Sequence, residues 1–294
     1  MALTLAESAK LSLDMLRRGV VETIIEASPM LNVLPFQQVE GNSFKYNREN
    51  TLGGASFYAV NGQWTEVTAT FTQVTSNLAI LGGDADVDNF IQRVRSNVQD
   101  QRAVQTALKA KAVARKWEQT MITGDTAADS NAFDGMRTLV PASQRVSAGT
   151  NGGPLTLDLM DQVIDLVKPG KPDLLVMSKR TRRRLKALLT ASAHYVETGT
   201  QFGRQVMMYD GIPVEVSDFQ PDDETQAAGS NLSSVYAIQF GDEGLMGLQN
   251  GEVETVDIGQ LEAKDAQRVR IRWYVGLALM REQAAARITG VNAS

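Results

Sequence analysis

The sequence has 294 residues, of which 43% are hydrophobic, and a formal net charge of −5, so it can form one large domain or two modest ones with a real core. It contains no cysteine, which excludes disulfides and thiolate metal sites, and no stretch of about 20 apolar residues that could cross a membrane. An acidic chain also argues against binding nucleic acid over its whole surface, although local basic patches remain compatible with this balance.

The first forty residues predict an arm that packs on something other than itself. Residues 5–28 carry apolar side chains at a spacing of three and four, as in an amphipathic helix: Leu13, Leu16, Val20, Ile24 and Ile25. Ser28-Pro29 ends this helix, because a proline disfavours helical backbone in the residue before it. The apolar segment MLNVLPF follows and has no partner within the arm.

Residues 41–83 predict a long β-ribbon. Gly53-Gly54 and Asn61-Gly62 are turn signals, and the residues from Thr65 to Phe71 alternate between apolar and threonine side chains with the period of a strand. The alternation slips at Gln73-Val74, which predicts a bulge. The ribbon has too few bulky apolar groups for a core of its own, and an isolated two-stranded ribbon is at best marginally stable in water. We expect it to lie on a neighbour.

Residues 84–123 predict a long helix. Asp84, Asp86 and Asp88 suit its N-terminus, where carboxylates cap free amides and oppose the helix dipole. Apolar residues then recur as far as Met121, and Gly124 ends the helix. At 1.5 Å per residue, the roughly 36 helical residues would span about 50 Å, which suits a spine across a flat molecule.

The loop GTNGGP (149–154) indicates a domain boundary before a compact α/β block. This block should contain a helix at 155–167, a buried strand at 173–177 and a second helix that Ser178 caps. The C-terminal third is rich in strands. Its clearest strand runs from Gln267 to Glu282, where apolar residues alternate with Arg268, Arg270 and Arg272.

Two basic features stand out in this acidic chain. The second helix carries six cations within eight positions and should be basic on all sides: Lys179, Arg180, Arg182, Arg183, Arg184 and Lys186. The other feature is the row of three strand arginines. Either could contact phosphate or carboxylates. We favour carboxylates for both, because neither interleaves aromatic residues as single-strand nucleic-acid binders do. For the strand, the expected partners are Glu252, Glu254 or Glu262 across the sheet, or acidic loops of another subunit.

The sequence offers no catalytic or cofactor-binding pattern. His194 is the only histidine, and no glycine-rich phosphate loop is present. The acidic clusters at 84–88 and 222–224 fit helix capping and a solvated loop better than a calcium site. We therefore expect no enzyme activity, no cofactor and no metal.

The order of these parts resembles the major capsid proteins of tailed bacteriophages, which have the Hong Kong 97-type shell fold. The stretches VMSKRTRRRLKALL, YDGIPVEVSD, GLMGLQ and RWYVGLALMRE carry the likeness, which covers nearly the whole chain. It implies an α+β fold with five parts: an N-terminal arm (1–40), an extended loop (41–83), a peripheral domain with a spine helix (84–154), an axial domain (155–235) and return strands of the peripheral domain (236–294).

The resemblance implies hexamers and pentamers of an icosahedral shell that encloses double-stranded DNA by non-specific contact. The partners would be other copies, a portal, a separate scaffolding protein and a decoration protein, without a membrane, in a virion assembled in the host cytoplasm. Tyr58, Trp64 and Phe71 would contact the next subunit through the extended loop. A set of basic residues would lie at subunit interfaces or face phosphate: Arg182, Arg183, Arg184, Lys186, Arg268, Arg270 and Arg272. The alternative is an encapsulin-like nanocompartment, which shares this fold and encloses protein cargo.

Overall fold

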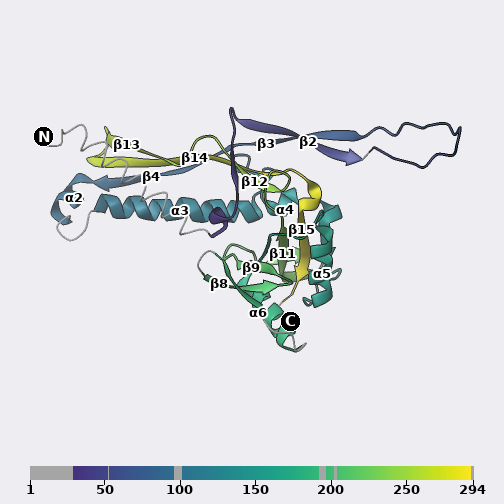
Figure 1. Cartoon of the computed structure of the whole chain (residues 1–294). Helices are drawn as coiled ribbons and strands as arrows, with labels where there is room; N and C mark the ends of the chain where they lie inside the picture. Colours follow the sequence, from purple (N-terminus) through teal and green to yellow (C-terminus); the bar gives the residue numbers. More distant parts are fainter. Residues whose placement is uncertain (1–28, 52, 96–100, 192–196, 202–203, 293–294) are drawn as a thin grey trace. The chain divides into compact units, whose positions relative to one another are not determined.

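The computed structural model describes residues 29–51, 53–95, 101–191, 197–201 and 204–292, in a mixed α+β fold (Figure 1). The predicted helix at 5–28 and His194 lie outside these residues. The chain divides into two compact units, each assembled from separate segments. Unit 1 comprises Met1–Asn42, Leu78–Thr138 and Gly247–Leu277, and unit 2 comprises Ser43–Asn77, Leu139–Met246 and Ala278–Ser294. The GTNGGP loop lies inside unit 2.

The long strand β14 (Ala266–Leu279) organises unit 1, as its alternating sequence predicts. It pairs antiparallel with β13 (Glu254–Gln260) and with β4 (Ala79–Asp88). The sheet continues through β12 (Leu245–Gln249) to the parallel strand β1 (Phe36–Gln38). Every second side chain of β14 from Val269 to Val275 is buried.

Helix α3 (Gln101–Thr123) packs along this sheet and closes the core of unit 1 (Figure 1). Its buried stripe follows the helical spacing of three and four: Ala110, Val113, Ala114, Trp117 and Met121. Trp117 forms an aromatic cluster with Phe36 and Trp273, with ring centroids 5.5 to 6.1 Å apart. A β-carbon at Gly247 would collide with the Phe36 ring, so this position requires glycine.

The predicted helix at 84–123 is wrong at its beginning. Residues 84–88 belong to β4, helix α2 (Asn89–Arg95) follows, and α3 begins only at Gln101. Asp88 does cap α2, because its Oδ1 accepts a hydrogen bond from the Phe90 amide at 2.8 Å. The intervening Ala85 and Val87 are buried, which is the period of a strand and not of a helix terminus.

The first two acids of that segment pair with arginines across the sheet. Arg268 donates from Nε and Nη2 to Asp86 at 2.6 and 2.7 Å, and Arg270 donates to Asp84 at 2.7 and 2.8 Å. Each arginine lies directly opposite its partner in the β4–β14 register. The hydrogen bonds from Arg270 and Arg268 hold the pKa values of Asp84 and Asp86, respectively, below their ordinary values.

Unit 2 is built on an eight-stranded sheet ordered β5-β15-β11-β6-β9-β8-β7, with β10 paired to β11. The last strand, β15, pairs with β11 and β5, so it belongs to this sheet and not with the return strands β13 and β14. The strands are β5 (Arg145–Ser147), β6 (Leu174–Met177), β7 (Glu197–Gln201), β8 (Arg204–Tyr209), β9 (Ile212–Val216), β10 (Glu224–Gln226), β11 (Gly229–Ile238) and β15 (Ala285–Val291).

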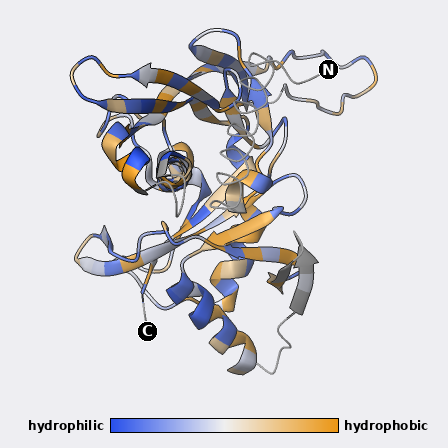
Figure 2. Cartoon of the chain, turned by 90° about the vertical axis from the view of Figure 1, so that its left-hand side faces the viewer, coloured by the Kyte–Doolittle hydropathy of each residue, from blue (hydrophilic) through white to orange (hydrophobic). Residues whose placement is uncertain are grey.

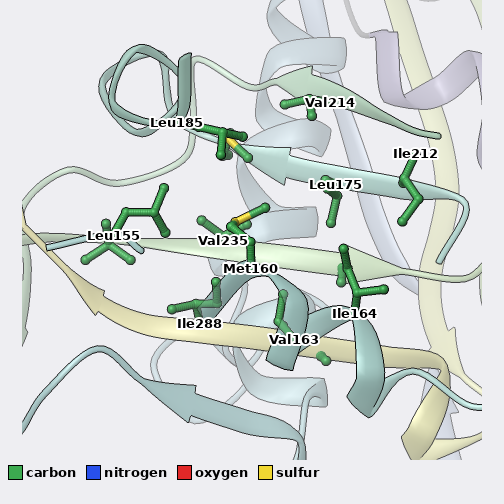
Figure 3. Packing of buried hydrophobic residues seen from close by; sticks show 14 of the residues in the cluster. Leu155, Met160, Val163, Ile164, Leu175, Leu185, Ile212, Val214, Val235 and Ile288 are labelled. Carbon is green, nitrogen blue, oxygen red and sulfur yellow. The ribbon is translucent and has the colours of Figure 1, made fainter. Parts of the chain in front are cut away.

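Helices α5 (Leu157–Leu166) and α6 (Lys179–Ala191) pack into one core on this sheet. Figure 3 shows Met160, Val163 and Ile164 of α5 and Leu185 of α6 among strand residues such as Leu175. The predicted cap of α6 is confirmed, since Ser178 Oγ accepts a hydrogen bond from the Thr181 amide at 3.2 Å. Thr156 caps α5 in the same way. The short helix α4 (Met136–Leu139) precedes this region.

The ribbon is an antiparallel hairpin of β2 (Ser43–Thr51) and β3 (Thr70–Asn77), shorter than expected. Its strand begins at Thr70 and not at Thr65, and the irregularity lies between Glu49 and Thr51 and not at Gln73-Val74. Tyr46 and Arg48 fix the base, because both donate hydrogen bonds to the Leu279 carbonyl, at 2.9 and 2.6 Å.

A buried ion pair joins β10, β11 and β15. Arg287 Nη2 lies 2.9 Å from Glu224 Oε2, and their side chains are only 7% and 6% exposed. Ser234 completes the network by donating to Glu224 at 2.5 Å and accepting from Arg287 Nε at 3.0 Å. The Arg287 guanidinium also lies 5.4 Å from the centre of the Tyr236 ring. The charges are therefore compensated within the sheet.

We predict that acid weakens unit 1 through Asp84 and Asp86. Because their pKa values are lower in the folded chain than in the unfolded chain, they stabilise the fold above the unfolded value of about 3.9, and this contribution is lost as the pH falls through the folded values. Unfolding measured from pH 6 to pH 2 should show a shallower loss for Asp84→Asn/Asp86→Asn than for wild type. Equal slopes would contradict the assignment.

We predict that Arg287→Met costs about 3–5 kcal/mol of unfolding free energy, because it leaves the Glu224 carboxylate buried without its cation. Denaturant unfolding measures this cost. The control is Arg281→Met, which removes the partner of Glu243, a residue 81% exposed, and should cost about 0–1 kcal/mol. Similar costs for the two variants would show that burial of the Arg287 pair has no special weight.

Candidate assembly surfaces

Helix α6 has one apolar face and one charged face. Thr181, Leu185 and Leu189 recur every four residues and are buried. The expectation of a helix that is basic on all sides is therefore wrong, because the charges stop where the helix meets the core. In Figure 2, α6 is the helix that leads into the grey trace at the bottom, and it carries a band of hydrophilic residues.

The first two cations of α6 are held by carboxylates of unit 2. Lys179 Nζ lies 2.6 Å from Asp218, and both side chains are exposed. Arg180 Nη2 donates to the Asn231 carbonyl at 2.9 Å, and its Nε lies 3.4 Å from Asp222. These contacts attach the start of the helix to the loop before β10 and to strand β11.

The other four cations of α6 have no carboxylate partner among the residues that the structure describes. Arg182, Arg183 and Lys186 are exposed, and Arg184 is half-buried. The ion pairs of the described chain include none of these four residues. The expected carboxylates of the same subunit are thus absent from this part of the chain. This face of α6 is open to another molecule.

The strand arginines, by contrast, are occupied. Arg268 and Arg270 bind the β4 acids described above, and Arg272 Nε donates to Glu254 Oε2 at 2.7 Å. Glu254 is one of the partners that the sequence predicts, and it lies opposite Arg272 in the register with β13. These three arginines therefore link neighbouring strands of one sheet, and carboxylates of that sheet neutralise their charge.

The hairpin tip holds aromatic side chains in water. Phe57 is 109% exposed, Trp64 79% and Phe71 66%. Tyr58 stacks on Trp64 with ring centroids 4.3 Å apart, and its hydroxyl donates to the Thr65 carbonyl at 3.0 Å. The predicted turn at Asn61-Gly62 is confirmed, with the Gly62 amide bonded to the Ala59 carbonyl at 2.9 Å. The tip is an exposed apolar surface without a core behind it.

Sequence reasoning missed the roles of Asp84 and Asp86 in the sheet and the Arg287–Glu224 pair. Alternation with Ala85 and Val87 was a signal for the first, whereas the second joins residues that are distant in sequence. Among the described residues, no cluster of three ligating side chains could hold a metal ion. No described helix combines the length and hydropathy needed to cross a membrane.

Comparisons with known proteins agree with this architecture. No curated protein matches the sequence. The structure is similar to the SrpI encapsulin complex of Synechococcus elongatus, with 17% identity, 90% of this chain and 88% of that chain covered, and a TM-score of 0.73. It is also similar to the capsid of a native GTA particle, with 17% identity, 90% of each chain covered and a TM-score of 0.65. A Mycobacterium phage Bobi chain gives 14% identity, 89% and 90% coverage and a TM-score of 0.64.

These structures share the Hong Kong 97-type fold with this chain, as the order of elements implies. At such low identity they establish the fold alone. The family model for the SU10 major capsid protein matches residues 12–292, which is nearly the whole sequence. The chain therefore belongs to the SU10 major capsid protein family and is a phage-type major capsid protein.

Proposed function

We propose that this capsid protein forms hexamers and pentamers of a closed icosahedral shell around double-stranded DNA. The hairpin tip is the observation that carries the proposal. Phe57, Val60 and Trp64 are 109%, 94% and 79% exposed, and burying such apolar surface favours association. A neighbouring copy can cover the tip, and a repeated contact between two different surfaces generates a ring where the rotation between copies closes. Tyr58, Trp64 and Phe71 would lie in that contact.

The proposal extends to the other components of a virion. A separate scaffolding protein would guide assembly. A portal and a decoration protein would complete the particle, which would assemble in the host cytoplasm. The protein would be structural and not an enzyme, with no cofactor and no membrane contact.

The cations of α6 that have no partner in the described chain would mainly contact neighbouring capsid subunits, and DNA only secondarily. Arg182, Arg183 and Arg184 would contact carboxylates and carbonyl groups of neighbouring copies, with DNA a secondary partner. An arginine fork suits carboxylates as well as phosphates. The net charge of −5 supports carboxylates over DNA as the main partner. An acidic shell repels DNA in general, and it has more carboxylates than cations.

An encapsulin-like compartment is the second candidate, and the similarity to the SrpI encapsulin complex is the observation in its favour. The family match favours the viral role. We predict that particles purified from a productive infection contain nuclease-protected double-stranded DNA at a constant mass ratio to this protein. Extraction, gel electrophoresis and mass spectrometry of the contents test this. A single enriched cargo protein without DNA would reverse the assignment.

We predict that Phe57→Ser/Trp64→Ser leaves the subunit folded but reduces the yield of particles. The two side chains contribute to no core of their own chain, so their loss should act between copies. Circular dichroism and thermal melting of the unassembled subunit should match wild type, while sedimentation should show fewer shells. Ala55→Ser/Gln63→Ser is the matched control in the same loop and should assemble normally. Normal yield from the Phe57/Trp64 variant would refute the role of the tip.

A further inference from the structure

Helix α5 carries a row of acids on its outer face. Asp158, Asp161 and Asp165 are exposed, at a spacing of three and four, while Met160 and Val163 face the core. Asp158 accepts a hydrogen bond from Gln162 at 2.7 Å, and Asp161 accepts one from the Tyr209 hydroxyl at 2.6 Å. No ion pair within the described part of the chain includes any of the three aspartates.

Several other acidic groups of the described chain are engaged in ion pairs or in hydrogen bonds to the backbone. Asp84 and Asp86 hold strand arginines, and Asp222 and Glu224 hold Arg180 and Arg287. The acidic loop at 125–134 uses its carboxylates on its own backbone: the amides of Thr126, Ala127 and Asn131 donate to Asp134, Asp125 and Asp129, respectively. The α5 row is thus a set of carboxylates whose charge remains unmatched.

The two helices offer complementary rows at the same spacing. Lys179, Arg182 and Lys186 of α6 follow the same intervals of three and four residues as the α5 aspartates, although Lys179 already binds Asp218, so Arg182 and Lys186 are the cations of this row that stay unpaired in the described chain. Each row therefore spans about 10 Å along its helix. Within one chain no described ion pair joins α5 to α6, although both helices pack on the core of the same sheet. A second copy can bring the rows together.

We propose that the open cations of α6, Arg182, Arg183 and Lys186, pair with the α5 carboxylates of a neighbouring copy. The proposal rests on the proposed self-assembly and names the contact surfaces. Because the two surfaces differ, the contact is heterologous, and in the proposed hexamers and pentamers it would repeat from copy to copy around the ring. Contact with DNA would account for α6 alone and would leave the acidic row unmatched. Contact between copies accounts for both rows, and such charges govern register and partner choice.

A charge swap tests the pairing in empty particles assembled without DNA. The reversal of α6, Arg182→Glu/Lys186→Glu, should lower the particle yield about tenfold, because carboxylates would then face carboxylates. The reversal of α5, Asp158→Lys/Asp165→Lys, should do the same. Asp161 is left in place because it binds Tyr209. The chain with all four substitutions should recover assembly to within about twofold of wild type, since the pairs are restored with opposite sign.

The matched control combines the α6 reversal with Asp242→Lys/Glu262→Lys. These two carboxylates are exposed and form no ion pair in the described chain, so the control has the same net charge as the four-substitution rescue. It should not recover assembly. Recovery in this control would show that only net charge matters and would overturn the pairing. Normal empty-shell yield for either single-helix reversal, or no recovery in the swap, would overturn it as well.

The design separates this pairing from the proposed function. If wild type itself forms no particles, the proposed assembly fails, whereas assembly of wild type with failure of the swap refutes only the α5–α6 contact. If only DNA-filled particles suffer from the α6 reversal, the cations bind phosphate and the pairing is wrong. Should the reversed helix not fold, as judged by circular dichroism, Arg182→Gln/Arg183→Gln/Lys186→Gln replaces it. In that variant the assembly should lose the salt dependence that this pairing predicts for wild type, and an equal salt dependence of the two proteins would count against the contact.

Discussion

The main physical constraint in this structure is that the hairpin tip exposes large apolar side chains to solvent. Burial of such surface is the main driving force of association, and the tip has no core behind it. The base of the hairpin is anchored within its own unit, because Tyr46 and Arg48 both bind the Leu279 carbonyl. The chain thus presents an exposed apolar surface at the end of a hairpin whose base is anchored by hydrogen bonds. A copy that covers it stabilises the folded subunit by mass action.

The charged side chains fall into two groups, those paired within a sheet and those on helix surfaces without an ion-pair partner in the described chain. Arginines inside the sheets are matched at short range: Arg268 and Arg270 by β4, and Arg287 by Glu224 in a buried network. Such pairs fix strand positions and leave no charge for a partner. The outer faces of α5 and α6 instead keep rows of one sign without a partner in the described chain. Matched charges stabilise the subunit, and in the proposed assembly the unmatched rows would contact neighbouring subunits.

Local sequence patterns correctly predicted those elements that are determined by interactions between residues close in sequence. The strict alternation of β14 and the Ser178 cap of α6 were read correctly, because the period of a strand and the chemistry of a cap lie within a few residues. The start of α3 was not, because Asp84 and Asp86 suit a helix N-terminus as well as a strand. The partners that decide the matter, Arg270 and Arg268, lie 186 and 182 residues away.

The candidate surfaces were predicted in part for a similar reason. Nearly consecutive cations concealed the buried stripe of Thr181, Leu185 and Leu189, so the sequence indicated a basic helix without its orientation. Tyr58, Trp64 and Phe71 were predicted as contact residues because the ribbon lacks a core, whereas Phe57, which is fully exposed, was not. Which carboxylates face α6 could not follow from one chain's pattern, because the proposed partner belongs to another copy. The family match then adds what the fold alone leaves open, the role of the chain as a capsid protein.

Trp64 provides the most direct measurement of the central claim that neighbouring copies cover the hairpin tip. The protein has three tryptophans, and the other two, Trp117 and Trp273, are only 0% and 4% exposed in the single chain, whereas Trp64 is 79% exposed. Acrylamide quenching of tryptophan fluorescence should therefore report Trp64 in the unassembled subunit. If neighbours cover the tip, assembly into shells should remove most of this quenching and shift the emission to shorter wavelength. Quenching that stays unchanged from subunit to shell would contradict the account.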